Sequence, residues 1–120
     1  MKIGVIGAGS WGTTIANMLA LNGHSVTLWV YEADLCERMR ERSENDLYLP
    51  GFPLSKEIKF TSSLEEGVSG MEIVVSAAPA QVVRRVVSKA VPHISDNAII
   101  VSLSKGIEEG TLMLMSDLLK

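Results

Sequence analysis

The sequence is short of cysteine, histidine and long apolar runs, and each shortage excludes a class of protein. Its 120 residues hold one cysteine, Cys36, which excludes an internal disulfide and gives no sign of an oxidising compartment. The two histidines stand far from this cysteine, so we expect no metal site. No stretch reaches the roughly 18 uninterrupted apolar residues of a transmembrane helix, and glycines interrupt the one that follows Lys2, which is therefore no signal peptide. We expect a cytoplasmic protein without a membrane span.

Basic residues are also too few for a surface that binds nucleic acid. Lysine and arginine total 11 against 14 acidic residues, which gives a net charge of −3. The hydrophobic share of 47% is that of a globular protein, and the length suits one core. The last predicted helix, residues 112–120, has no C-terminal cap and no trailing proline. We therefore expect a single domain over residues 1–120 that is incomplete at its C-terminal end.

Short apolar runs alternate with amphipathic stretches along the chain, a pattern typical of an α/β fold with a parallel sheet. The runs at 73–75 and 98–101 are continuously apolar, which predicts central strands covered on both faces. Ser63-Leu64-Glu65-Glu66 matches a capping box, and 43–57 is predicted to be an ordered loop. Strands are predicted at 2–6, 25–30, 58–61, 73–75 and 98–101, and helices at 11–21, at 33–42, from Ser63 to near Gly70, and from Pro79 onward.

The most specific motif is Gly7-Ala8-Gly9-Ser10-Trp11-Gly12, which lies between a predicted strand and a predicted helix. In this arrangement Gly7 permits the tight turn, Gly9 lets a pyrophosphate approach the backbone, and Gly12 lets the helix pack close to the strand. The helix N-terminus then offers free N–H groups to the phosphates. The alternative is a tight turn without a ligand. The context favours a Rossmann-type, doubly wound parallel sheet that binds a dinucleotide.

Glu32 lies twenty residues after Gly12, at the end of the second predicted strand. A carboxylate at this place accepts hydrogen bonds from ribose hydroxyls and repels a 2′-phosphate. No arginine lies between Thr27 and Arg38, so NAD is favoured over NADP. A solvated acid at the start of a helix is the alternative for Glu32. The neighbouring Tyr31 lies either against an adenine or in ordinary packing.

Lys105 follows the predicted strand at 98–101, within Ser102-Leu103-Ser104-Lys105-Gly106-Ile107-Glu108. Ligands of open parallel sheets bind beyond the carboxyl ends of the strands, so its ammonium group is placed to polarise a carbonyl or hold a phosphate. A solvated loop lysine is the alternative. Cys36 lies on a charged helix, and we expect an inert side chain there.

Four separated segments resemble the NAD-dependent glycerol-3-phosphate dehydrogenases. The resemblance covers most of the chain, and two of the segments, an Asn45 to Gly51 loop and a Lys-Gly-Ile-Glu stretch, are not expected in other dehydrogenases of this fold. The matching segments are Gly7-Ala8-Gly9-Ser10-Trp11-Gly12-Thr13, Leu28-Trp29-Val30-Tyr31-Glu32, Asn45 to Tyr48-Leu49-Pro50-Gly51, and Ser102 to Glu108.

The resemblance implies an enzyme that interconverts dihydroxyacetone phosphate and sn-glycerol 3-phosphate with a nicotinamide cofactor, for glycerophospholipid synthesis. By position, Ser10 and Trp11 would line the cofactor pyrophosphate and Tyr31 the adenosine. Lys105 would serve cofactor, substrate and catalysis, and Ala78-Pro79 falls in a loop near the cofactor. Val30-Tyr31-Glu32 replaces the basic residue with which many bacterial relatives accept NADP.

The family's second lysine and its helical C-terminal domain lie beyond residue 120, so we expect this chain to bind NAD without turning over substrate. Losing those parts leaves apolar surface exposed, which makes a homodimer conceivable. Two other functions stay open. One is a different dehydrogenase of the same fold, acting on a hydroxyacyl-CoA or a sugar nucleotide, and the other is an NAD-sensing regulatory module without catalysis.

Overall fold

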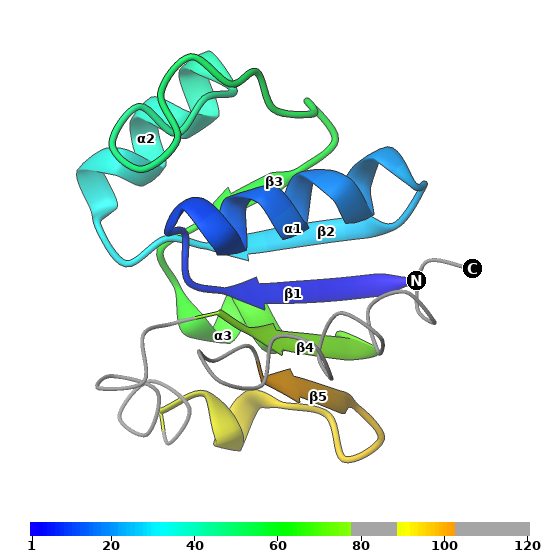
Figure 1. The fold of residues 1–120 in the computed structure, drawn as a ribbon. Coiled ribbons are helices and arrows are strands. Elements are labelled where there is room, and N and C mark those ends of the chain that lie inside the picture. The colour runs from blue at the N-terminus through cyan, green and yellow to red at the C-terminus, as the bar shows by residue number, and fades with distance from the viewer. Residues whose placement is uncertain (78–88, 103–120) are drawn as a thin grey trace.

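The computed structural model describes residues 1–77 and 89–102, which form alternating strands and helices (Figure 1). The predicted helices that begin at Pro79 and at residue 112 lie outside the described residues. The elements are β1 (Lys2–Ile6), α1 (Ser10–Leu21), β2 (Ser25–Trp29), α2 (Ala33–Arg42), β3 (Lys59–Thr61), α3 (Leu64–Val68), β4 (Ile73–Ser76), a 3₁₀ turn (Val91–His93) and β5 (Ile99–Ser102).

The five strands form one parallel sheet in the order β3-β2-β1-β4-β5. The chain builds outward from β1 to β3 and then returns to the other side of β1, where β4 pairs. Ligands of open α/β sheets bind outside the carboxyl ends of the strands at such a reversal. The predicted Rossmann-type sheet is confirmed, and its reversal lies between β1 and β4.

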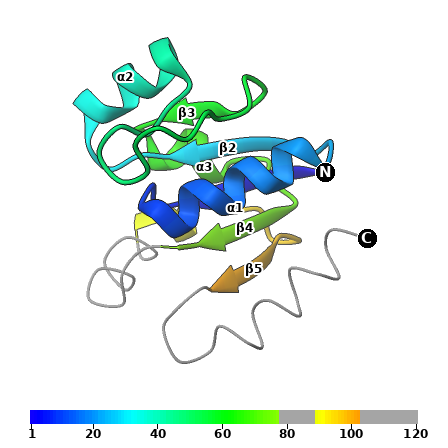
Figure 2. The same ribbon diagram turned by 45° about the horizontal axis from the view of Figure 1, so that its top comes forward.

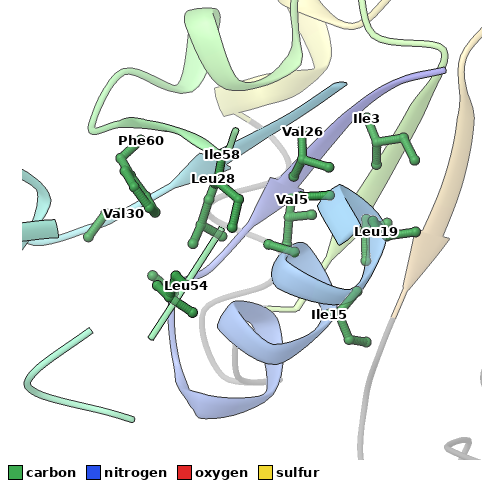
Figure 3. Packing of buried hydrophobic residues seen from close by; sticks show 14 of the residues in the cluster. Ile3, Val5, Ile15, Leu19, Val26, Leu28, Val30, Leu54, Ile58 and Phe60 are labelled. Carbon is green, nitrogen blue, oxygen red and sulfur yellow. The ribbon is translucent and has the colours of Figure 1, made fainter. Parts of the chain in front are cut away.

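Helices cover both faces of the sheet (Figure 2). On one face, α1 and α2 bury a large apolar core against the strands, and on the other face α3 covers a smaller core that includes Trp29 and Val68. Figure 3 shows Ile15 and Leu19 of α1 in the same core as Val5 of β1 and Val26 of β2. All four side chains are almost completely buried, so this shared core holds α1 on β1 and β2.

The approach of α3 to the sheet depends on a glycine in β1. A Cβ atom added at Gly4 would lie 2.0 Å from the carbonyl oxygen of Gly67 in α3. No side chain fits in that space, so a glycine at position 4 lets α3 lie against the strand. The contact is on the face of the sheet opposite α1.

The strand β5 differs from the prediction. Residues 98–101 were expected to form a central strand covered on both faces, but β5 lies at the edge of the described sheet, and Ile99 and Ile100 are 54% and 52% exposed. Val101 is buried. The described residues thus leave the side chains of Ile99 and Ile100 partly uncovered. No helix among residues 1–77 and 89–102 has the length and apolarity to cross a membrane.

Candidate functional site

The glycine turn joins β1 to α1 at the carboxyl edge of the sheet. In Figure 1 the ends of β1 and β2 and the first turn of α1 lie together at the left. The N–H of Gly7 donates to the carbonyl oxygen of Trp29 at 3.2 Å, which ties the turn to the end of β2. Gly7 has a φ of 109°, a conformation that other residues rarely adopt. Its predicted role in the tight turn is confirmed.

Gly12 lets α1 pack closely on the turn. A Cβ atom at this position would lie 2.0 Å from the carbonyl oxygen of Gly7 and 3.1 Å from the Cβ atom of Ala77, just after β4. Gly12 thus lies where β1, α1 and the end of β4 meet, which is the reversal point of the sheet. The predicted close packing of helix and strand is confirmed.

Gly9 behaves differently from its two neighbours. Its φ of −66° is ordinary for any residue, and an added Cβ atom would meet no atom of the described residues within 4 Å. Neither backbone strain nor packing in the described protein requires a glycine here. The open space beside Gly9 fits a ligand that approaches the backbone, as a pyrophosphate does in this motif.

The first turn of α1 begins beside this open space, and no side chain of the described residues caps its N–H groups. Gly9 is the N-cap and makes no side-chain cap bond, and no acidic residue lies in the first turn. The first intrahelical bond runs from the N–H of Thr13 to the carbonyl oxygen of Gly9 at 3.0 Å. Ser10 is exposed and Trp11 is 44% exposed. Such a terminus attracts anions, because its N–H groups and its dipole point outward.

Glu32 lies three residues after β2 and is the N-cap of α2. Its carboxylate makes no cap bond to the helix. Instead, Oε2 accepts a hydrogen bond of 2.7 Å from the phenol of Tyr48. This arrangement differs from a capping or freely solvated acid, since a residue sixteen positions away holds one oxygen of the carboxylate. The bond raises the pKa of Tyr48, because it stabilises the protonated phenol beside an anion.

Tyr31 precedes Glu32 and is 76% exposed. Its ring lies edge-on to the ring of Trp29, with centroids 6.0 Å apart and an interplanar angle of 80°. The Trp29 indole is fixed by a hydrogen bond of 3.1 Å to the carbonyl oxygen of Ser62. Tyr31 therefore has one supported edge, and most of its surface is available to a ligand.

The loop of residues 43–57 carries two site residues whose roles the sequence did not predict, Asn45 and Tyr48. Asn45 is 0% exposed, and its Nδ2 donates to the carbonyl oxygen of Ala8 at 2.7 Å and to Oγ1 of Thr13 at 2.9 Å. Its Oδ1 accepts the N–H of Tyr48 at 3.0 Å. The only sequence signal was the unusual loop itself, which resembled the family without indicating these contacts.

Three of the predicted site residues, Ala78, Pro79 and Lys105, lie outside the described residues. The structure brings the other seven together at the carboxyl edge of the sheet: Gly7, Gly9, Ser10, Trp11, Gly12, Tyr31 and Glu32.

Within the described part of the chain, no three metal-binding side chains cluster. Cys36, expected to be inert, is buried, and burial raises the pKa of its thiol.

A separate open pocket of about 540 Å³ lies beside β3, lined in part by Arg40, Lys59 and Glu66. Its best-placed polar groups already have partners. Arg40 donates to the carbonyl oxygen of Phe60 and to Glu37, and Glu66 accepts from Thr61. The pocket does not include the glycine turn. We assign the site to the turn, because no atom of the described residues fills the space beside Gly9.

The sheet order and the glycine turn define a Rossmann domain of the dinucleotide-binding class. A family model described as the NAD-dependent glycerol-3-phosphate dehydrogenase N-terminus matches residues 2–120. The chain belongs to this family.

Individual relatives agree with the family match. The chain is 57% identical over its 120 residues to a glycerol-3-phosphate dehydrogenase [NAD(P)+] of Syntrophotalea carbinolica, of which it covers 36%. Among solved structures, it matches the Saccharomyces cerevisiae enzyme with a TM-score of 0.82 at 32% identity, over 88% of this chain and 34% of that one. The Coxiella burnetii enzyme matches with a TM-score of 0.81 at 30% identity, over 98% and 37%. The chain thus spans about a third of the length of these relatives.

The family match bears on one of the two other functions that the sequence left open, a different dehydrogenase of the same fold. A dehydrogenase for hydroxyacyl-CoA or sugar-nucleotide substrates shares the fold, but the family shown here is that of the glycerol-3-phosphate dehydrogenases.

Proposed function

We propose that this chain is the NAD-binding part of an enzyme that interconverts dihydroxyacetone phosphate and sn-glycerol 3-phosphate, the phosphorylated small-molecule substrates, for glycerophospholipid synthesis. The observation that supports binding most directly is the open space at Gly9, where no contact among the described residues requires a glycine. The substrates in this proposal follow from the family to which the chain belongs. When bound, the nicotinamide would accept or donate the hydride.

Each described site residue has a place in this proposal. Gly7 and Gly12 shape the turn, and Gly9, Ser10 and Trp11 would hold the pyrophosphate with backbone N–H groups at the positive end of α1. The face of Tyr31 would lie against the adenosine. These roles need no movement of the glycine turn, which its contacts with Trp29, Asn45 and α1 already fix.

Charge favours NAD over NADP. The Glu32 carboxylate would accept hydrogen bonds from the adenosine ribose and repel a 2′-phosphate. The nearest arginine after β2, Arg38, is held by Asp46 in two hydrogen bonds of 2.8 and 3.0 Å. Its guanidinium is therefore committed to another carboxylate. The same contact holds the pKa of Asp46 below its ordinary value.

The catalytic part of the proposal rests on Lys105, which would lie beside the nicotinamide and the substrate with Ala78 and Pro79 nearby. Its ammonium group would hold or polarise the substrate oxygen without any change of protonation. The family's second lysine lies beyond this chain. We therefore propose that residues 1–120 alone bind NAD and do not turn over substrate.

Location and assembly complete the proposal. A cytoplasmic protein suits the one cysteine, which is a buried free thiol.

Exposed Ile99 and Ile100 on β5 offer apolar surface that another part of the complete protein or a second copy would cover. We propose a homodimer of the complete protein. Light scattering that gives twice the chain mass would support this, and a monomer would contradict it.

A Lys105→Ala variant of the complete protein separates an enzyme from an NAD sensor. The sensor would use the glycine turn and Glu32 in the same way but would have no use for a lysine beyond the last strand. We expect the variant still to bind NADH and to lose turnover of dihydroxyacetone phosphate. Calorimetry measures the first and NADH absorbance the second. A wild-type protein that binds NADH and never oxidises it would favour the sensor.

A further inference from the structure

We propose that Tyr48 is a specificity-determining residue of the dinucleotide site and acts by positioning Glu32. The inference rests on the proposed NAD site. Tyr48 donates its phenol hydrogen to Oε2 of Glu32 at 2.7 Å, which leaves Oε1 to accept a hydrogen bond from the ribose. The carboxylate is thereby fixed at the end of β2, where it discriminates between a ribose hydroxyl and a 2′-phosphate.

Glu32 needs such a partner, because nothing else in the described contacts orients it. Glu32 is the N-cap residue of α2, but its side chain makes no hydrogen bond to the helix and is only partly buried. A carboxylate of this kind is free to rotate into solvent, and ordering it costs side-chain entropy when the ligand binds. A hydrogen bond to a charged acceptor is among the stronger ones in proteins. The phenol therefore restricts Glu32 to one orientation before the ligand arrives.

Tyr48 itself is held by Asn45. The Asn45 side chain is completely buried, accepts the backbone N–H of Tyr48, and donates to the carbonyl oxygen of Ala8 in the glycine turn. One buried amide thus links the part of the site that would hold the pyrophosphate to the residue that orients the ribose acid. The backbone of Tyr48 is thereby tied to the turn next to which the dinucleotide would bind.

The rest of the loop is anchored away from Glu32, which makes a control possible. The N–H of Ser55 donates to Oδ1 of Asn17 on α1 at 2.8 Å, and Leu54 is buried in the larger core. Asn17 is in the middle of α1, away from its first turn. An Asn17→Ala substitution removes a neutral hydrogen bond that fixes the same loop and leaves the contact between Tyr48 and Glu32 in place.

The experiment measures dissociation constants of NADH and NADPH by calorimetry for the complete protein and for the Tyr48→Phe, Glu32→Ala, double and Asn17→Ala variants. We expect Tyr48→Phe to weaken NADH about five- to tenfold and NADPH little or not at all, since binding must then order the Glu32 side chain and the repelling carboxylate is no longer fixed. In the Glu32→Ala background, the same substitution should change neither constant. Asn17→Ala should leave the ratio of the two constants unchanged.

Three results would overturn the inference. The first is an unchanged ratio in Tyr48→Phe, and the second is an equal loss in Tyr48→Phe with and without Glu32, which would mean that the phenol acts directly on the ligand. The third is a change of ratio in Asn17→Ala as large as that in Tyr48→Phe, which would mean that loop order alone is responsible. If Glu32→Ala itself leaves NADH binding unchanged, the proposed ribose site fails together with the inference.

Discussion

The side-chain amide nitrogen of Asn45 lies 2.7 Å from the carbonyl oxygen of Ala8, although the two residues are 37 positions apart. Asn45 thereby fastens a long loop to the glycine turn, and Thr13 joins the contact by donating to the same carbonyl at 3.2 Å. The turn is thus held from the side as well as by β1 and α1. Binding of a ligand there does not depend on the backbone of the turn alone.

Replacing Asn45 with alanine should reduce both stability and dinucleotide affinity. The change leaves the buried Ala8 carbonyl short of a donor and the partly buried Tyr48 N–H without its acceptor. We expect the free energy of unfolding to fall by about 2 to 4 kcal/mol. Urea denaturation measures this fall. A loss below about 0.5 kcal/mol, typical of a surface substitution, would contradict the anchoring role.

Gly4, Gly9 and Gly12 have different surroundings, so replacing each with alanine should affect stability and NADH affinity differently. Gly9→Ala should change the free energy of unfolding by less than about 1 kcal/mol, because its φ is ordinary and its surroundings are open, while alanine is a poorer N-cap than glycine. NADH affinity should nevertheless fall at least about tenfold, or 1.4 kcal/mol. Thermal unfolding and NADH calorimetry on the complete protein measure the two effects. Unchanged affinity would remove Gly9 from the site.

Gly12→Ala and Gly4→Ala are the matched comparisons, since each would place a Cβ atom 2.0 Å from a backbone carbonyl oxygen. Both should lose about 2 kcal/mol or more of stability by overpacking. Only Gly12→Ala should also weaken NADH binding in the fraction that remains folded, because Gly4 faces α3 on the far side of the sheet. Equal loss of affinity in both variants would show that stability alone controls binding.

The ion pair of Arg38 and Asp46 predicts a pH dependence. Arg38 lowers the pKa of Asp46 in the folded protein, so the pair stabilises above the unfolded-state pKa of about 3.9 and loses this contribution as the pH falls through the folded-state value. The difference in melting temperature between wild type and Asp46→Asn should therefore be largest near neutral pH and vanish in strong acid. A difference that is constant with pH would contradict the ion pair.

Cys36 should resist thiol reagents in the folded protein. Its side chain is 1% exposed, and burial raises the pKa of the thiol above its ordinary value of about 8.5. Little of the reactive thiolate therefore forms near neutral pH. Peptide mass spectrometry after brief treatment with iodoacetamide should find Cys36 modified only in denaturant. Rapid modification of the native protein would mean that α2 opens readily.

The sequence predicts those features that depend on local periodicity. The helix at 33–42 has the predicted bounds, with Leu35 and Met39 buried, and every strand begins and ends within one residue of its predicted bounds. Periodicity succeeds here because each element buries one continuous apolar face. The exposed Ile99 and Ile100 show the limit, since an apolar run indicates that a strand is covered without saying which part of the protein covers it.

Contacts between distant side chains could not be predicted in this way. The capping box at Ser63 is half formed, since its hydroxyl accepts the N–H of Glu66 at 3.4 Å. The return bond is replaced, because Glu66 accepts from Thr61 and the N–H of Ser63 donates to Thr61. The bond from Tyr48 to Glu32 likewise depends on the path of a loop that no periodic pattern describes. The structural roles of Gly7 and Gly12 were predictable, because the tight turn and the close approach of α1 involve residues that are near in sequence.

NADH oxidation by the complete protein with dihydroxyacetone phosphate tests the central claim most directly. The proposed site predicts rapid oxidation of NADH, much slower oxidation of NADPH, and none by residues 1–120 alone. Equal rates with both cofactors would contradict the role assigned to Glu32 and Tyr48. If neither cofactor is oxidised by the complete protein, the proposed reaction is wrong.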